Sequence, residues 1–413
     1  MNGRFFQINI LFLTDNFPPE GNAPATRTYE HAVRWVKAGH QVTIITCAPN
    51  FPDGKVFPGY ENRLYSQEEI EGIVVVRVKT YIAANEGFAA RILDYMSFMV
   101  ASFIAGLFQK EPDVIVATSP QFFCAVAGWA LSVVRCKPFI FELRDIWPAS
   151  ITAVGAMKDS IAIRILEKIE MFLYDRADQI ISVTNSFKDE LIRRGVSAAK
   201  ISVVTNGVDL KKYKPTKEKD RDLSTEYHLD NKFVVGYIGT HGLAHALESI
   251  VGAAEILKYR EDLVFVFAGG GAAKLGIEAE CKKRSLSNVI FIEQQPKEMM
   301  PKLWSLCDVS LIHLKNVPLF ETVIPSKIFE TMGMGLPILI GVPEGEATRI
   351  VRELGCGVVV PPENSKAIAD AVVLLADDKA LISSLRESSL KAASHFSRDT
   401  LANVMIERLA KSV

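Results

Sequence analysis

The sequence has no surplus of one charge sign, few cysteines and no long apolar run near its start. Lys and Arg total 47 against 48 Asp and Glu in 413 residues, so the basic excess of a general nucleic-acid binder is missing. The six cysteines are scattered, with no C-x-x-C and no short spacing to a histidine. This pattern argues against a zinc site or a disulfide framework and indicates a reducing cytosol. The early apolar run at 8–13 is too short for a signal peptide.

Several catalytic motifs are missing as well. No G-x-G-x-x-G follows the first expected strand, which sets aside a nicotinamide oxidoreductase. There is no G-x-S-x-G elbow for a serine nucleophile. A D-x-D spacing occurs at Asp220 and Asp222, but it lies within a charged stretch, so we interpret it as solvated and expect no metal site.

The chain is instead rich in short apolar runs that alternate with helical patterns. Hydrophobic residues make up 49% of the composition, and strands alternating with helices predict parallel sheets covered on both faces. We therefore expect an α/β fold with an N-terminal domain at 1–205, a charged linker at 206–231, a C-terminal domain at 232–396 and a final helix at 397–413. The strands that we expect are 8–13, 41–46, 74–78, 114–118, 139–143, 180–183, 201–204, 233–238, 263–268, 289–292, 309–313, 337–340 and 357–360.

One expected helix, 88–108, is unusually apolar. Its last 14 residues, from Tyr95, carry no charge, which falls short of the roughly 20 needed to span a bilayer. Two interpretations stay open: a buried crossover helix, or a helix lying in a membrane interface, with Phe98 and Phe103 as contacts. The helix at 161–173 is a second candidate for such a contact.

In doubly wound domains the ligand lies at the carboxyl ends of the strands, so the loops there are candidate sites. After the first strand, the segment 17–24 contains Gly21 and Asn22 and leads directly into a helix. Glycine lets a backbone approach a ligand closely, and the free amides of a helix start favour an anion. A turn that holds no ligand explains the same residues.

The second domain repeats this pattern. Thr240, His241 and Gly242 follow the strand at 233–238, and a triple glycine centred on Gly270 follows the next strand. Such turns predict a negatively charged ligand held by backbone amides. The alternative is that both are tight turns whose glycines only supply a positive φ.

The segment 324–330 is the most informative. Proline suits a first helical turn, so Lys327 and Glu330 are expected on one helical face near its start. The ammonium can meet a phosphate, and the carboxylate can accept hydrogen bonds from two vicinal hydroxyls. The alternative is an ordinary surface ion pair.

In the first domain, Arg144 and Asp145 follow a strand and precede Ile146, Trp147 and Pro148. Charged groups at a strand's carboxyl end are candidates for acceptor binding or proton handling. They equally fit a local ion pair.

Together, these motifs resemble glycosyltransferase family 4 over nearly the whole chain. The marks are Phe17-Pro18-Pro19 with Gly21, the helix exit at 38–43, Thr205-Asn206-Gly207-Val208-Asp209, the Gly270 turn, and Pro325-Ser326-Lys327 with Glu330 and Gly335-Leu336-Pro337. The segments 21–27 and 144–148 further resemble bacterial O-antigen and capsule transferases, in particular L-fucosamine transferases. The resemblance implies the GT-B fold, two facing Rossmann-like domains with the active site in the cleft between them, and retaining chemistry.

The resemblance also implies roles for residues. Glu330 matches the second glutamate of the family's E-x7-E motif, which binds the nucleotide ribose, while Thr322 stands in place of the first. The family's Arg/Lys pair for the diphosphate is missing after Gly239, and we infer that Lys327 supplies part of that charge. Asp145, with Arg144, replaces the family histidine and becomes the candidate acceptor contact. The expected catalytic residues are Asp145, Arg144, Lys327 and Glu330, and the expected donor-binding residues are Gly21, Asn22, Thr240, His241, Gly242, Gly270, Ile292, Pro325, Ser326, Lys327 and Glu330.

These assignments predict a metal-independent transferase with no cofactor. It moves a sugar such as N-acetyl-L-fucosamine from a UDP-sugar to a polyprenyl-diphosphate-linked saccharide in O-antigen or capsule synthesis. We expect it in the cytoplasm, peripherally at the inner face of a bacterial membrane, and without nucleic acid. Two rivals remain: a sugar-nucleotide 2-epimerase of the same fold, and a non-catalytic protein that keeps the fold.

Overall fold

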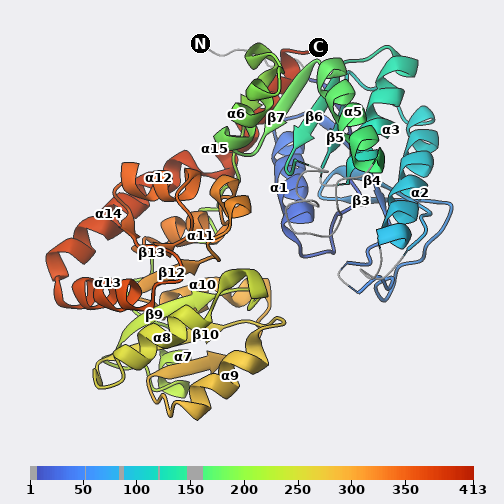
Figure 1. Ribbon diagram of the computed structural model, residues 1–413. Coiled ribbons are helices and arrows are strands. Elements are labelled where there is room, and N and C mark those ends of the chain that lie inside the picture. The colour runs from blue at the N-terminus through green and yellow to red at the C-terminus, as the bar shows by residue number, and fades with distance from the viewer. Residues whose placement is uncertain (1–6, 52, 83–87, 120, 147–160) are drawn as a thin grey trace. The chain divides into compact units, whose positions relative to one another are not determined.

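The chain folds into two units, each with its own sheet (Figure 1). The computed structural model describes residues 7–51, 53–82, 88–119, 121–146 and 161–413. The first unit comprises residues 1–205 and 398–413, and the second comprises 206–397. The charged stretch at 206–231 belongs to the second unit and contains a short helix, α7 (Arg221–Glu226).

The first unit is built on an eight-stranded sheet in the order β3-β4-β2-β1-β5-β6-β7-β8. All neighbours pair in parallel except β3 with β4. The sequence patterns missed β3, because this edge strand is polar and never buried, so it lacks the apolar run by which the others were found. The strands are β1 (Asn9–Leu13), β2 (Gln41–Cys47), β3 (Tyr65–Ile70), β4 (Ile73–Val78), β5 (Val114–Thr118), β6 (Phe139–Leu143), β7 (Gln179–Ser182) and β8 (Ile201–Val203).

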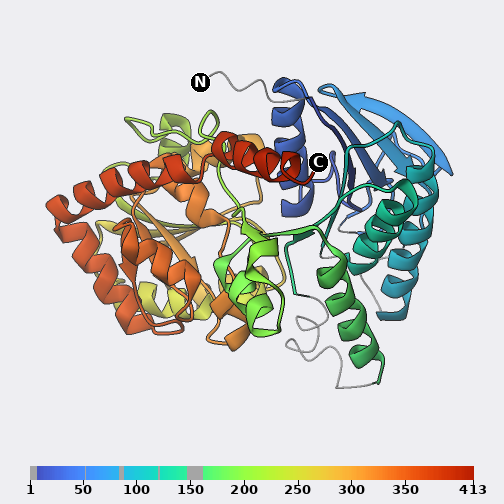
Figure 2. The same cartoon turned by 90° about the horizontal axis from the view of Figure 1, so that it is seen from above.

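Helices cover both faces of this sheet. Because side chains alternate along a strand, Leu11 and Leu13 of β1 join one buried cluster, while Ile10 and Phe12 join another. The first cluster packs under α2 (Phe88–Leu107), α3 (Phe122–Arg135), α5 (Ile161–Arg176) and α6 (Asn185–Arg193). The second packs under α1 (Ala23–Lys37) and the last helix, α15 (Arg398–Ala410), which packs against α1 (Figure 2).

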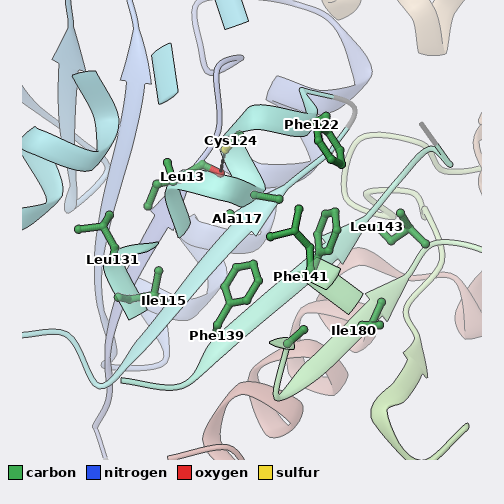
Figure 3. Close-up of a cluster of buried hydrophobic side chains, with 14 of the residues drawn as sticks. Leu13, Ile115, Ala117, Phe122, Cys124, Leu131, Phe139, Phe141, Leu143 and Ile180 are labelled. Atoms are coloured by element: carbon green, nitrogen blue, oxygen red, sulfur yellow. Dashed lines mark hydrogen bonds between the residues drawn. The ribbon is translucent and has the colours of Figure 1, made fainter. Parts of the chain in front are cut away.

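Figure 3 shows the first cluster at the centre of the sheet. Phe139 and Phe141 of β6 stack with their ring centroids 6.2 Å apart, and the Cys124 thiol of α3 donates a hydrogen bond to the Leu13 carbonyl at 3.2 Å. This packing holds α3 against the sheet, so the carboxyl ends of β1, β5 and β6 are set on a rigid base.

The second unit has a six-stranded parallel sheet in the order β11-β10-β9-β12-β13-β14. Its strands are β9 (Phe233–Ile238), β10 (Leu263–Ala268), β11 (Val289–Ile292), β12 (Val309–His313), β13 (Ile338–Gly341) and β14 (Gly357–Val359). The buried cluster on one face includes residues of α8 (Glu248–Ile256), α9 (Lys274–Lys283) and α13 (Ser365–Asp377), and those on the other include residues of α10 (Met300–Ser305), α11 (Lys327–Met334) and α12 (Glu346–Glu353). The helix α14 (Lys379–His395) contributes to both sides.

In both sheets the strand order reverses beside the first strand of the unit. β1 lies between β2 and β5, and β9 lies between β10 and β12. In open α/β sheets such a reversal opens a crevice at the carboxyl ends of the two strands, which is where ligands bind. The loops after β1 and β9 are therefore the places to examine in each unit.

Candidate functional site

At the carboxyl edge of the second unit, two glycine turns pack against each other. Gly239 follows β9 with φ 129°, and Gly269 follows β10 with φ 140°, a region that residues with a side chain rarely adopt. A Cβ placed on Gly269 would lie 2.1 Å from the Gly239 carbonyl oxygen. The His241 N–H donates to the Gly270 carbonyl at 2.8 Å, so the two turns form one layer. Glycine is therefore needed at these positions for two reasons: the backbones of the two turns touch, and both residues have a positive φ.

Lys327 lies directly against this layer. Its Nζ is 3.9 Å from the centroid of the Tyr237 ring, and a Cβ on Gly239 would come within 2.6 Å of its Cε. Within the described residues Nζ makes no hydrogen bond or ion pair. Burial lowers the pKa of the Lys327 ammonium to about 7, although Glu330 opposes the shift. The surface ion pair considered from the sequence is therefore absent, and the ammonium retains donors for an anion.

Glu330 lies one turn further along α11. Its Oε2 accepts a hydrogen bond from Nε1 of the fully buried Trp304 at 3.3 Å. An indole N–H fixes the carboxylate without neutralising it, since indole is a neutral donor. The predicted placement of Lys327 and Glu330 on adjacent turns of one helix is observed.

Three histidines surround the same edge. The Glu363 N–H donates to Nε2 of His313, so the proton of that ring is on Nδ1, which donates to the His245 carbonyl at 2.8 Å. Nδ1 of His245 lies 3.3 Å from the His313 carbonyl. This reciprocal pair joins the loop after β9 to the end of β12 across the point where the strand order reverses.

His241 differs from the other two because both of its ring nitrogens are buried with no hydrogen-bond partner in the part of the chain that the structure describes. Burial, with the nearby Lys327 charge, lowers its pKa to about 4, so the ring is neutral at pH 7. Buried polar atoms in proteins are usually paired. The fully buried neutral imidazole thus keeps one donor and one acceptor unused beside Lys327.

The other residues predicted to bind the donor differ in how exposed they are at this edge. Thr240 and Ser326 are exposed, Pro325 and Gly270 are half-buried, and Gly242 begins the turn that carries His245. The Ile292 side chain is buried in the core, and its carbonyl accepts the Gly269 N–H at 3.0 Å. Ile292 therefore positions the glycine layer through its backbone.

In the first unit, the loops after β1 and β6 meet. Asn22 caps α1 by accepting the Ala25 N–H at 2.8 Å, and Gly21 is exposed just before it. The Arg144 guanidinium donates to the Pro24 carbonyl at 3.2 Å, which ties the two loops together. The Ser119 hydroxyl after β5 accepts the N–H groups of Arg144 and Asp145 at 2.7 and 3.1 Å. Trp147 and Pro148, the end of this motif, lie outside the described residues.

A buried ion pair lies beneath these loops. Nε of Arg27, on α1, is 2.9 Å from Oε1 of Glu142, at the end of β6, and both side chains are 2% exposed. The same guanidinium donates to the Val204 and Thr205 carbonyls at 2.8 and 2.6 Å. Arg27 thus holds the end of β6 next to the residues that follow β8, Val204 and Thr205.

Sequence reasoning missed Asp15 and Asp94. Asp15 follows β1 at the strand reversal, and burial raises its pKa to about 7, with Glu20 and Asp94 adding to the rise. Burial also raises the pKa of Asp94, on α2, to about 6. The position of Asp15 directly after a buried strand was the signal available in the sequence. Nothing in the sequence pairs it with Asp94, since the two are brought together only by packing of α2.

The edges of the two units show no grouping that could hold a metal. Over the described ranges, no three His, Cys, Asp or Glu side chains gather as a metal site would require. Nor does any described helix have the length and apolar character needed to cross a membrane.

Two family profiles match the chain, one in each half. Glycosyltransferase Family 4 matches residues 24–212, and Glycosyl transferases group 1 matches residues 219–393. Among curated proteins, the chain is 26% identical over 378 residues to WcaI of Escherichia coli strain K12, named as a colanic acid biosynthesis glycosyl transferase, with 88% of this chain and 91% of WcaI covered.

Solved structures of glycosyltransferases share the fold. Sucrose-phosphate synthase from Thermosynechococcus elongatus superposes with a TM-score of 0.77 at 17% identity, covering 97% of this chain and 98% of the other. Anabaena Alr3699/HepE, solved in complex with UDP, gives 0.73 at 18% identity, covering 98% and 100%. The predicted GT-B fold, two Rossmann-like units on parallel sheets, is confirmed, and the protein is a glycosyltransferase with a Glycosyltransferase Family 4 domain followed by a Glycosyl transferases group 1 domain.

Proposed function

We propose that this enzyme transfers a sugar from a UDP-sugar to a lipid-diphosphate-linked oligosaccharide in the synthesis of a bacterial O-antigen or capsule. The observation that carries the proposal is Lys327, an unpaired ammonium held against two glycine turns at the carboxyl edge of the second sheet. The relative named for colanic acid synthesis and the UDP-bound structural neighbour support a polysaccharide product and a UDP donor.

The donor diphosphate is neutralised by Lys327 and the start of α11. Ammonium hydrogen bonds to phosphate are charge-assisted and strengthen as negative charge develops on the leaving group. The positive end of a helix adds to this field. On this proposal the reaction proceeds without a divalent cation, and the resemblance to family 4 implies that the product keeps the anomeric configuration of the donor.

Glu330 holds the nucleotide. A carboxylate can accept two hydrogen bonds, so it can bind vicinal ribose hydroxyls while Trp304 keeps it oriented. His241, neutral and unpaired, is placed to contact the sugar or the diphosphate beside Lys327.

The first unit supplies the acceptor side. Arg144 and Asp145 stand at the end of β6, braced by Ser119, and Asp145 is the group that we assign to an acceptor hydroxyl. The resemblance of the segments around Gly21 and Arg144 to L-fucosamine transferases points to N-acetyl-L-fucosamine as the sugar.

The enzyme binds peripherally at the inner face of the cytoplasmic membrane through one stripe of α2. Leu93, Met96, Val100 and Ile104 recur every three or four residues and are 43–52% exposed, and Phe108 just beyond them is 81% exposed. Exposed apolar stripes of this kind mark interaction surfaces. Phe98 and Phe103, the contacts expected from the sequence, were the wrong choice: Phe98 is fully buried and Phe103 packs against the core.

Co-sedimentation with vesicles containing anionic lipid tests this surface. The double variant Val100→Asp, Ile104→Asp should lose vesicle binding and stay folded, because both side chains are half-exposed. Leu275→Asp, at a well-exposed position on α9, is the matched control and should bind as the wild type does. Undiminished binding of the double variant would show that α2 does not contact the membrane.

Calorimetric titration with UDP tests the donor assignment. Glu330→Ala should weaken UDP binding about tenfold, which corresponds to the loss of one hydrogen bond to a charged group. Glu330→Gln should keep the hydrogen bond with Trp304 and should therefore weaken UDP binding less. Glu353→Gln, on the exposed face of α12, is the control. Equal UDP affinity for Glu330→Ala and wild type would refute the role of Glu330.

A product assay with and without lipid-linked acceptor separates the proposed reaction from its rivals. Transfer should require the acceptor. Conversion of the nucleotide sugar in its absence would indicate a 2-epimerase, and donor binding with no turnover under either condition would indicate a non-catalytic protein.

A further inference from the structure

A cavity of the second unit lies at the amino ends of the strands, opposite the glycine layer. It has a volume of about 470 Å³ and is lined by the segment 215–219, by Asp308 before β12, by Leu336 before β13 and by Arg386 on α14. Ligand pockets in proteins commonly have volumes of this size. Lys327 and Glu330 do not line it.

The acidic groups of this cavity are already occupied. Oδ2 of Asp308 accepts hydrogen bonds from Nζ of Lys219 at 2.8 Å and from the Val234 N–H at 2.9 Å. The exposed Glu218 pairs with Arg221 at 3.0 Å. Lys219 is committed as well, because it also donates to the Lys232 carbonyl at 2.8 Å.

The cationic groups keep unused donors. Arg386 reaches only Oδ1 of Asp308, through one terminal nitrogen at 3.4 Å, and its Nε is buried with no acceptor among the described residues. Lys217 is exposed and has no ion pair in the same set. A buried N–H without an acceptor is uncommon in folded proteins. The cavity therefore offers cationic hydrogen-bond donors that lack an acceptor, and an anion would supply one.

Apolar side chains form part of the remaining wall, which also includes Thr216 and Ser305. Met334 and Leu336 are buried side chains of the core that also line the cavity, together with the partly exposed Leu390 of α14. A ligand that pairs with Arg386 therefore meets hydrocarbon on its other side, which favours a molecule with one anionic group and an apolar body.

We propose that this cavity is a second ligand site, distinct from the donor site, for a small phosphate ester or carboxylate with an apolar body, and that Arg386 is its anchor. Its place at the amino ends of β12 and β13 separates it from the glycine layer at the carboxyl ends. The proposal does not depend on the identity of the donor or acceptor.

Calorimetric titration of the full-length protein with phenyl phosphate tests the site. Phenyl phosphate should bind saturably, and inorganic phosphate, which lacks the apolar body, should bind at least tenfold more weakly. Arg386→Gln should weaken phenyl phosphate binding at least tenfold without changing UDP affinity. Arg352→Gln, on the exposed side of α12, is the matched control and should bind both ligands as the wild type does.

Each other outcome overturns the proposal. Absence of saturable binding at millimolar phenyl phosphate, or unchanged binding by Arg386→Gln, removes the site. Competition between phenyl phosphate and UDP would assign the probe to the donor site. Equal affinity for inorganic phosphate would refute the apolar half of the ligand.

Discussion

The carboxyl edges of the two sheets carry opposite chemistry. In the second unit, burial lowers the pKa of the basic groups, to about 7 for Lys327 and about 4 for His241 and His245. In the first unit, burial raises the pKa of the carboxyl groups, to about 7 for Asp15 and about 6 for Asp94. One edge thus holds basic groups without a counter-charge, which favour the neutral form until an anion binds beside them, as suits an anionic donor. The other holds acids that favour the neutral form, as suits a polyol acceptor.

The difference extends to how each edge is built. The second unit brings its turns together through glycines, which allow backbone atoms to touch. The first unit uses side chains: Arg27 and Glu142 pair beneath the loops, and Ser119 braces Arg144. A backbone-built edge lets a ligand approach the main chain closely, whereas a side-chain-built edge presents varied polar groups suited to distinguishing acceptors.

The largest effect that we expect comes from breaking the buried pair of the first unit. Arg27→Met leaves the Glu142 carboxylate buried without its partner, so the free energy of unfolding should fall by about 3–5 kcal/mol. Calorimetric unfolding of the full chain measures it, with Arg63→Met, whose pair with Glu61 is exposed, as a control that should change little. A loss under about 1 kcal/mol would mean that the pair does not hold this edge.

The next largest effect concerns donor binding at the carboxyl edge of the second unit. Lys327→Met keeps the length of the side chain and removes its charge, so UDP affinity should fall about 10- to 100-fold, the value of hydrogen bonds to a charged group. Titration calorimetry measures the loss, and Lys283→Met on the exposed side of α9 is the control. If Lys327→Met bound UDP with wild-type affinity, Lys327 would not bind the donor diphosphate and the proposed donor site would be wrong.

The pH dependence of donor binding follows from the same lysine. Because the pKa of Lys327 is about 7 in the free protein, the ammonium is lost above that pH, and a diphosphate that requires it must first restore the proton. UDP affinity should be constant below about pH 7 and fall above it, by at most about tenfold per pH unit for one proton. Lys327→Arg, which stays protonated, should flatten the profile. A wild-type profile that is flat from pH 6 to 9 contradicts this linkage.

The smallest effect concerns Asp15. Its pKa is raised in the folded protein, to about 7, so the native state binds more protons than the unfolded state, and stability falls as pH rises from about 4 to 7. Asp15→Asn should remove this contribution to the pH-dependent decrease in the free energy of unfolding. We expect the contribution to be on the order of 1 kcal/mol, because the half-buried carboxyl is screened by water. Urea unfolding at pH 4.5 and pH 7.5 measures the difference, and an unaltered slope in Asp15→Asn would show that Asp15 ionises freely.

Much of the fold was predictable from local patterns. The apolar runs marked nearly every strand, because strands of a parallel sheet are buried on both faces and leave a continuous signal. The polar edge strand β3 left no such signal and was missed. The apolar helix at 88–108 was identified, but only packing decides that Phe98 faces the core while Val100 and Ile104 face outward.

The sequence by itself determined the order of strands and helices, the glycine turns after β9 and β10, and the spacing of Lys327 and Glu330, since each depends on neighbours within a few residues. The tertiary structure alone decided that Lys327 lies over Tyr237 without a carboxylate partner, that His241 is buried unpaired, and that Asp15 meets Asp94. These features arise from contacts between residues far apart in the chain. Burial and proximity, which set the charge of each group, exist only once the sheet and its helices have come together.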